Sequence, residues 1–445
     1  MTHPNGTVAR AVAASLGALV LLAACATPRT PQWKPLTAAD FAQPLTLAKC
    51  LELARKSDVR AAQWKARLDT VRAEVVSART LPNPTFIVEW DDVGLHDPTG
   101  ASLMTVAKEV GYPVGFWWLR GPKVASAKAA ERGETASVRA DQRRQAVDVG
   151  TAFFSLVADQ RRVTLSKDLR DIARESLRLA DRKKELGLGS AYDVNRANAE
   201  VLQSGSDLAD SEGQLRLDQL SFVFALGSER PLFPAVVDPE NIPALPPTDG
   251  ATSNVLPDSL IARALQADHA WAQARATREA AEADVSSQQR AAVPIGNTTL
   301  TGGPKKTPEG RSSIWTLEFP IPLFDWNRGG IRKAQAALLT AQAEEEKARR
   351  AVTASLSDSW ERATSSVFKW RGYARPLLAN LEKNQRAAQK LFAAGQIPYT
   401  DMLQAQRDLK QAQLKEIGLW RDAAAAIWTL ECSLGKHDPA TASRR

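Results

Sequence analysis

The hydrophobic residues of this chain follow two helical patterns. One apolar stripe recurs every seven residues, at Val194, Val201, Leu208, Leu215 and Phe222. Another steps by four and three residues, at Leu165, Leu169, Ile172, Ser176 and Leu179. Such recurrence over a long segment predicts helices that pack side by side as a coiled coil.

The helix that carries the second stripe is expected to be very long. Residues 120–186 hold no proline after Pro122 and few glycines. At ~1.5 Å per residue this helix would extend roughly 100 Å, which is far more than an ordinary globular domain needs. A self-contained coiled-coil bundle would explain the segment as well, so the segment alone does not decide the fold.

Two short segments have a period of two instead. Apolar residues alternate with polar ones at Phe86, Val88 and Trp90 and again at Trp315, Leu317 and Phe319. Loops at residues 94–100 and 302–310, with Gly302-Gly303-Pro304 in the second, are expected to join each strand to a partner. Strands of about ten residues suit a tilted transmembrane β-strand. A soluble hairpin packed on the helices is the alternative.

Tryptophans gather at these predicted strands. Five of them are expected to mark the bilayer boundary, because amphipathic rings favour the headgroup zone: Trp90, Trp117, Trp118, Trp315 and Trp326.

The chain also repeats itself, which bears on every other prediction. Residues 50–58 align with residues 260–268 at an offset of 210, and Gly187, Asp193 and Ala197 align with Gly395, Asp401 and Ala405 at an offset of 208. The second copy of the seven-residue stripe reads Met402, Leu409, Glu416, Ala423 and Leu430. The protein is therefore a duplicated unit.

The boundaries of the units follow from this alignment. We expect a first repeat at 25–227, with strands at about 84–118 and a helical hairpin at about 120–227. A proline-rich linker spans 228–257. The second repeat spans 258–435, with strands at about 294–323 and a hairpin at about 327–435, and a tail spans 436–445.

The N-terminus indicates export. Residues 1–24 have a short charged start and an apolar run of signal-peptide length. Cys25 follows Leu22-Ala23-Ala24, which looks like a bacterial lipobox, so we expect a lipid on the Cys25 thiol. An ordinary signal peptide with an incidental cysteine is the alternative.

Composition narrows the class further. Aromatic residues are only 6% of the chain and alanine is abundant, which favours long helices over a thick core. The net charge of +8 comes without basic clusters interleaved with aromatics, so solvated helix faces explain it and no nucleic-acid partner is expected. Cys50 and Cys432 are expected to be buried free thiols, with a disulfide between them as the alternative.

Catalytic and metal-binding patterns are not found in the sequence. The four histidines, His3, His96, His269 and His437, are scattered without a carboxylate or cysteine at ligand spacing. No nucleophile elbow, phosphate-binding loop or dinucleotide fingerprint lies between a strand and a helix. We therefore expect no enzyme activity, no metal site and no cofactor beyond the lipid.

The order of these features resembles the TolC-like outer-membrane factor family, in its lipoprotein form. The resemblance covers nearly the whole mature chain: a helix over 47–80 ended by Leu81-Pro82-Asn83-Pro84, a strand hairpin, a long helical hairpin with a glycine turn, a closing Leu226-Gly227, and a second copy. It implies a mainly α fold with a membrane β-barrel portion. It also implies a homotrimer with a shared twelve-stranded barrel and a long periplasmic α-helical barrel, located in the outer membrane.

The resemblance further implies roles for the two helical tips. Both turns are expected to dock a periplasmic adaptor: Gly187, Leu188, Gly189 and Ser190, and Gly395, Gln396, Ile397 and Pro398. Asp401 matches a position where family members form an acidic ring at the pore gate. Gln404 stands where a second acidic residue occurs in them, and Ile397 where an arginine does. From the residues alone, Asp401 is equally well explained as the N-cap of the final helix.

The function implied is a passive exit channel in a tripartite efflux system, with an adaptor and a proton-driven inner-membrane pump of the RND type as partners. The segment from Pro82-Asn83-Pro84 to Val93-Gly94 is similar to the cobalt-zinc-cadmium branch. Drug efflux and type I protein secretion remain alternatives, as does a periplasmic coiled-coil adaptor or structural lipoprotein.

Overall fold

A computed structural model describes residues 36–437 apart from residues 57, 102, 188, 229, 240–241, 243–244 and 246–255. The predicted signal peptide, the lipid attachment site at Cys25 and the tip residue Leu188 lie outside the described residues.

The same order of elements occurs twice. The first half, after a short 3-10 turn η1 (Ala38–Phe41), consists of α2 (Leu47–Lys56), α3 (Asp58–Arg79), β1 (Thr85–Asp91), β2 (Thr105–Tyr112), α4 (Phe116–Glu185) and α5 (Ala191–Leu226). The second consists of α6 (Asp258–Ala267), α7 (His269–Ala291), the turn η2 (Pro294–Asn297), β3 (Thr299–Thr307), β4 (Gly310–Glu318), α8 (Arg328–Phe368), the π-helical η3 (Lys369–Ala374), α9 (Arg375–Ala393) and α10 (Tyr399–Ser433).

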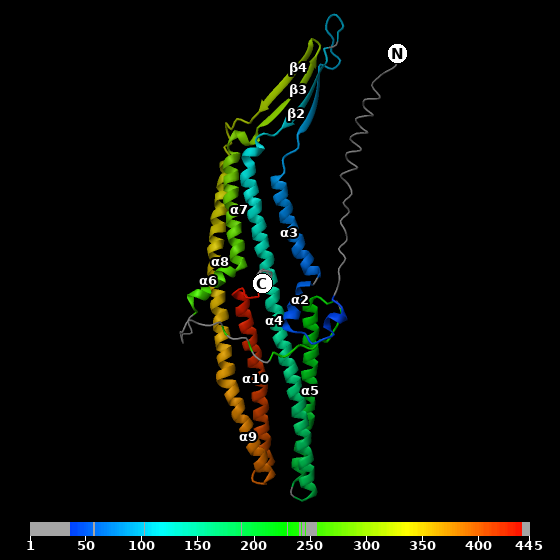
Figure 1. The fold of residues 1–445 in the computed structure, drawn as a ribbon, viewed down its shortest axis with the longest axis vertical. Helices are drawn as coiled ribbons and strands as arrows, with labels where there is room; N and C mark the ends of the chain where they lie inside the picture. The colour runs from blue at the N-terminus through cyan, green and yellow to red at the C-terminus, as the bar shows by residue number, and fades with distance from the viewer. Residues whose placement is uncertain are drawn as a thin grey trace, which may run out of the picture. The chain divides into compact units, whose positions relative to one another are not determined.

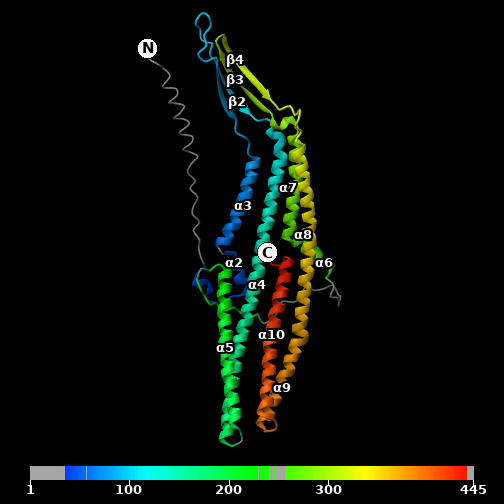
Figure 2. The same ribbon diagram turned by 180° about the vertical axis from the view of Figure 1, so that it is seen from behind.

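The sheet and the helical tips lie at opposite ends of the described part of the chain (Figure 1). Helix α4 is 70 residues long and runs from the sheet to the tip. Helices α3, α7 and α8 accompany its first half, and α5, α9 and α10 form the tip half, as the reverse view also shows (Figure 2). None of the helices in the described part of the chain is long and apolar enough to cross a membrane.

The four strands form one antiparallel sheet in the order β1-β2-β3-β4. We call one side of it the outer face, defined by Phe86, Val110, Trp315 and Leu317, all of which are exposed. The register places Phe86 opposite Val110, Val110 opposite Gly302, and Gly302 opposite Trp315, in one row across the sheet. This row of the outer face therefore presents an apolar surface to whatever surrounds it.

The opposite side of the sheet, the inner face, is polar. On β2 it carries Thr105, Ala107 and Glu109, all buried, and Thr301 of β3 is buried beside them. Alternation of apolar and polar faces is the pattern of a strand with lipid on one side and a polar interior on the other.

Several predicted boundaries in the sheet were wrong. The strands are seven to nine residues long, not about ten, and Trp117 and Trp118 belong to α4. The segment Gly302-Gly303-Pro304 was predicted as a loop but lies within β3. Gly302 serves close packing there, because a Cβ would come within 2.3 Å of the Trp315 ring. Pro304 falls where the β2–β3 ladder is interrupted between Ala107 and Val110, which is a place where a sheet tolerates proline.

The residues of the two apolar stripes are not equally buried. Leu208 and Phe222 of the seven-residue stripe are buried. On α4, however, Ser176 of the stripe is buried but Ile172 and Leu179 are exposed, and the small residues Ser166, Ala173 and Ala180 are buried in their place. Small side chains allow α4 and α5 to approach closely, which leaves the larger residues of the α4 stripe uncovered in a single subunit. The charged residue in the second copy of the stripe, Glu416, accepts a hydrogen bond of 2.7 Å from Nε1 of the buried Trp370 in η3.

The main core lies at mid-length, where both repeats meet. Phe154 of α4 and Trp420 of α10 pack edge to face there, with their ring centroids 6.1 Å apart. Cys50 and Cys432 are both buried and free, as expected, and burial raises the pKa of each thiol to about 12.

Gly150 makes a close helix contact in this core. Its backbone lies against the ring of Trp428, whose Nε1 donates a hydrogen bond of 3.0 Å to the carbonyl of Ala146 one turn away. A Cβ at Gly150 would lie 2.0 Å from that nitrogen. Only glycine permits this approach.

We therefore expect Gly150→Ala to destabilise the protein by about 1–3 kcal/mol of overpacking, less about 1 kcal/mol of gained helix propensity. The measurement is the melting temperature of purified protein in detergent. Gly205→Ala on α5 is the matched control, because a Cβ there meets nothing within 4 Å, so its melting temperature should hold or rise. Equal responses of the two variants would contradict this account.

Candidate functional site

The two tip turns are built on glycines with left-handed backbone. Gly187 has φ +72° and Gly395 has φ +73°, the conformation that glycine adopts without strain. After α9 the N–H of Gln396 donates to the carbonyl of Leu391 at 2.9 Å, and that of Gly395 donates to Phe392 at 3.0 Å. This is the Schellman arrangement that ends a helix and reverses the chain.

The returning helices start differently. Ser190 caps α5 reciprocally with Asp193: the N–H of Asp193 donates to the Ser190 hydroxyl at 3.2 Å, and the N–H of Ser190 donates to the Asp193 carboxylate at 3.3 Å. The corresponding cap of α10 is Pro398, which offers no side-chain bond. The first hairpin thus has a capping box that the second hairpin lacks.

Asp401 is not the N-cap of α10, so that alternative from the sequence was wrong. It is the third residue of the helix, and its carboxylate is exposed and accepts a hydrogen bond of 3.1 Å from the neighbouring Thr400 hydroxyl. Gln404, one turn later, is exposed on the same helix and donates to Asp408 at 2.8 Å. Asp408 was not singled out from the sequence, although its spacing of seven from Asp401 puts it on the same helix face.

The two tips pack against each other through a small apolar cluster. The tip cluster consists of Ala180, Ala197, Tyr399, Met402 and Leu403, all buried. Ile397 and Phe392 pack on its edge. Ala197 is fully buried, and its small side chain allows the neighbouring helices to approach closely. The cluster joins α4 and α5 to the start of α10.

Tyr399 carries an unmet polar group in this cluster. Its side chain is 5% exposed, and its hydroxyl has no hydrogen-bond partner in the described structure. Burial, followed by the nearby Glu200 carboxylate, raises the pKa of this phenol, so it stays neutral. A buried hydroxyl without a hydrogen-bond partner costs free energy, so Tyr399 lowers the stability of the tip cluster.

A lysine makes a further link between the hairpins. Lys183 Nζ, in the last turn of α4, donates a hydrogen bond of 3.1 Å to the backbone carbonyl of Phe392. The same nitrogen lies 3.5 Å from the centroid of the Phe392 ring. A cation over an aromatic face adds a modest attraction.

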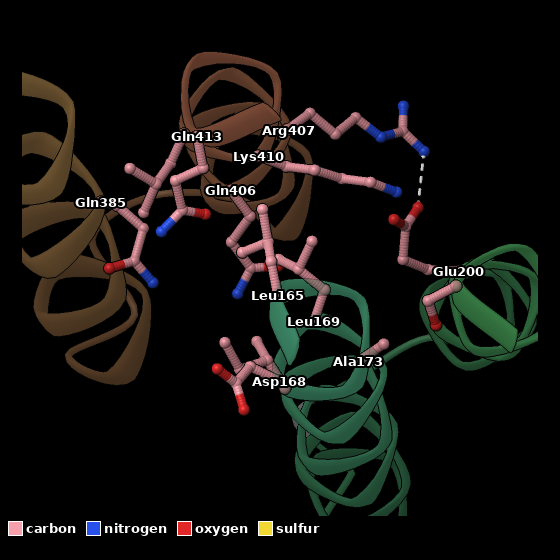
Figure 3. A pocket seen from close by; sticks show the side chains of 13 residues that line it. Leu165, Asp168, Leu169, Ala173, Glu200, Gln385, Gln406, Arg407, Lys410 and Gln413 are labelled. Atoms are coloured by element: carbon pink, nitrogen blue, oxygen red, sulfur yellow. Dashed lines mark hydrogen bonds and ion pairs between the residues drawn. The ribbon is translucent and has the colours of Figure 1, made fainter. Parts of the chain in front are cut away.

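Two ion pairs tie α5 to α10 above the tip cluster. Arg407 reaches Glu200 at 2.9 Å and Lys410 reaches Asp207 at 2.5 Å. Figure 3 shows both basic side chains extending from α10 toward α5. The four side chains are 16% to 46% exposed, and ion pairs that solvent still screens are individually weak, so these ties hold the hairpins reversibly.

A cavity of about 220 Å³ separates the hairpins beside these ties (Figure 3). Its lining comes from α4, α5, α9 and α10 and includes Leu165, Leu169 and Gln385. The two hairpins are therefore held together at the tip cluster and by the ion pairs. They are loosely packed at the cavity beside those pairs.

Among the described residues, no group of three or more His, Cys, Asp or Glu side chains is placed to hold a metal ion. His437 does have a carboxylate neighbour, contrary to the sequence-based expectation: Glu431 lies 3.1 Å from its Nε2, beside the Trp428 ring. That pair lies at the C-terminal end of α10, far along the helix from the tip.

Comparison with known proteins identifies the family. The profile of the outer membrane efflux protein family matches residues 51–228 and again residues 260–436. The chain belongs to the outer membrane efflux protein family. The resemblance seen in the sequence is thereby confirmed: the protein is an outer-membrane efflux channel subunit that extends into the periplasm.

Individual relatives agree with the family assignment. The cobalt-zinc-cadmium resistance protein CzcC of Cupriavidus metallidurans is 27% identical over 410 residues, which cover 90% of this chain and 93% of CzcC. A crystal structure of CusC superimposes with a TM-score of 0.72 at 15% identity, over 92% of this chain and 97% of that one. The open state of the Neisseria gonorrhoeae outer membrane channel MtrE gives a TM-score of 0.68 at 15% identity, over 92% and 98%. The mainly α fold of an efflux channel with a small membrane sheet is confirmed.

In this efflux protein the α5–α10 ties predict a measurable effect. We expect the double variant Arg407→Gln/Lys410→Gln to conduct more, or to stay open longer, in planar bilayers, because both ties are lost. Its melting temperature should change little, since an ion pair that solvent still screens contributes about 1 kcal/mol or less.

Arg362→Gln is the matched control, because it removes a pair of 2.9 Å with Asp358 that lies within α8. Conductance equal to the parent in the double variant would show that the ties do not restrain the hairpins.

Proposed function

We propose that three copies of this chain form the outer-membrane exit channel of a tripartite system that exports divalent metal cations. The observation that carries the proposal is the isolated four-stranded sheet with an apolar outer face and a polar inner face. Its outermost strands, β1 and β4, have edges with no partner strand in the described chain. Lipid does not tolerate unpaired strand edges, so other subunits must close the barrel.

The cargo and the partners are inferred from the relatives. CzcC bears cobalt, zinc and cadmium resistance in its name, and the sequence segment after Pro84 resembles the same branch. A periplasmic adaptor at the two tips and a proton-driven RND pump would complete the system. Gly187, Gly189 and Ser190, together with Gly395 to Pro398, form the surface proposed for the adaptor.

Lipid attachment at Cys25 is part of the same proposal and rests on the lipobox in the sequence. Cys25→Ser should stop incorporation of radiolabelled palmitate. Undiminished labelling would exclude this anchor.

The cargo can be tested by resistance. Deletion of the gene should lower tolerance to cobalt, zinc and cadmium salts several-fold, and the intact gene on a plasmid should restore it. Tolerance to lipophilic drugs in the same strains is the control. Loss of drug tolerance with unchanged metal tolerance would contradict the metal cargo and leave the channel assignment standing.

The gate is proposed at Asp401. Its carboxylate is exposed at the tip of the single subunit, with Gln404 beside it, as a ring around a three-fold axis would require. Three carboxylates near one axis attract cations and repel each other. We expect Asp401→Asn to reduce cation selectivity several-fold and to weaken block by trivalent cations in planar bilayers, with trimer assembly unchanged.

Asp422→Asn, which alters an exposed carboxylate farther along α10 that pairs with Arg421, is the matched control. Selectivity and block equal to the parent in Asp401→Asn would remove Asp401 from the gate.

A further inference from the structure

The outer face of the sheet is not apolar throughout. One row of residues across all four strands, which we call the basic row, consists of Trp90, Val106, Lys306 and Arg311: the register pairs Trp90 with Val106, Val106 with Lys306, and Lys306 with Arg311. Lys108 lies on the same face of β2, two residues closer to the helices than Val106. Three basic side chains thus gather on a face whose other rows carry Phe86, Val110, Trp315 and Leu317.

These three cations are exposed and have no acidic partner. No carboxylate lies within ion-pair distance of Lys108, Lys306 or Arg311 in the part of the chain that the structure describes. Strand alternation places Glu89 and Glu109 on the inner face instead. Lys306 and Arg311 also stand directly opposite each other on neighbouring strands, where like charges are unfavourable. An anion between them would remove that repulsion.

The position of the basic row in the sheet indicates what kind of anion could bind there. It lies at the end of the sheet farthest from the helices, next to the β3–β4 turn (Figure 1). A lysine or arginine on the lipid face is tolerated near the membrane interface and costs far more at the midplane. Trp90 in the same row is a residue type that favours the headgroup level. Because the helices extend into the periplasm, the row lies at the outer leaflet.

We propose that Lys108, Lys306 and Arg311 bind the phosphate groups of phosphorylated lipids in the outer leaflet. Lysine and arginine donate charge-assisted hydrogen bonds to phosphate, and the arginine does so with two parallel donors. The inference rests on the proposed placement of the outer face against lipid. In a trimer the row would occur three times around the barrel.

The test uses the purified full-length trimer in detergent with bis-phosphorylated lipid A, and dephosphorylated lipid A as the matched lipid. Native mass spectrometry counts the lipids retained. We expect the parent to retain the phosphorylated form at least tenfold better, and Lys306→Gln/Arg311→Gln to lose that preference, with Lys108→Gln weakening it. Lys305→Gln is the control, because Lys305 is the next residue on β3 and faces the inner side.

Retention by the double variant equal to that of the parent would overturn the inference. So would competition by millimolar inorganic phosphate that displaces the lipid, because it would indicate a site for soluble anions. Two claims are involved: that the outer face of the sheet lies in lipid, and that its basic side chains bind lipid phosphate. Quenching of the outer-face tryptophans by brominated lipids, measured on the same protein preparations, separates them. If quenching is present but the phosphate preference is absent, only this inference fails; if quenching is absent, the placement of the sheet in lipid fails with it.

Discussion

The fold depends on one constraint, which is that backbone N–H and C=O groups at a strand edge cannot be left unpaired in lipid. One chain supplies four strands, and β1 and β4 are the edges of that sheet. In the proposed trimer, closure by identical neighbours would satisfy these edges and would also place the helices of each subunit beside those of the next. The exposed Leu179 on α4 would then have a neighbouring surface to cover it.

Duplication supplies the architecture, and divergence between the copies supplies the asymmetry that a gate needs. The first hairpin has one continuous helix, α4, and a capping box at Ser190, whereas the second is interrupted by the π-helical η3 and has Pro398 as the N-cap of α10. Arg407 and Lys410 correspond in the repeat to Ala199 and Leu202. The ties to α5 therefore exist because the two copies differ in sequence.

Local patterns in the sequence predicted the helices, the strand hairpins and the glycine turns, because periodicity and backbone preference are properties of neighbouring residues. They misplaced Gly302 and Pro304, whose role depends on Trp315 across the sheet and on a gap in the ladder with β2. They also favoured the larger residues of the α4 stripe over the small ones that are buried. The Arg407–Glu200 pair joins residues 207 positions apart, and no spacing rule connects them.

The central claim is that the outer face of the sheet lies in lipid, and fluorescence quenching tests it most directly. Trp90 and Trp315 on that face are 60% and 72% exposed, whereas Trp420 and Trp428 in the core are each 2% exposed. Single-tryptophan variants that keep one of these four residues would be reconstituted with lipids brominated along the acyl chain. The account predicts strong quenching of Trp90 and Trp315 and little quenching of Trp420 and Trp428; equal quenching of both pairs would contradict it.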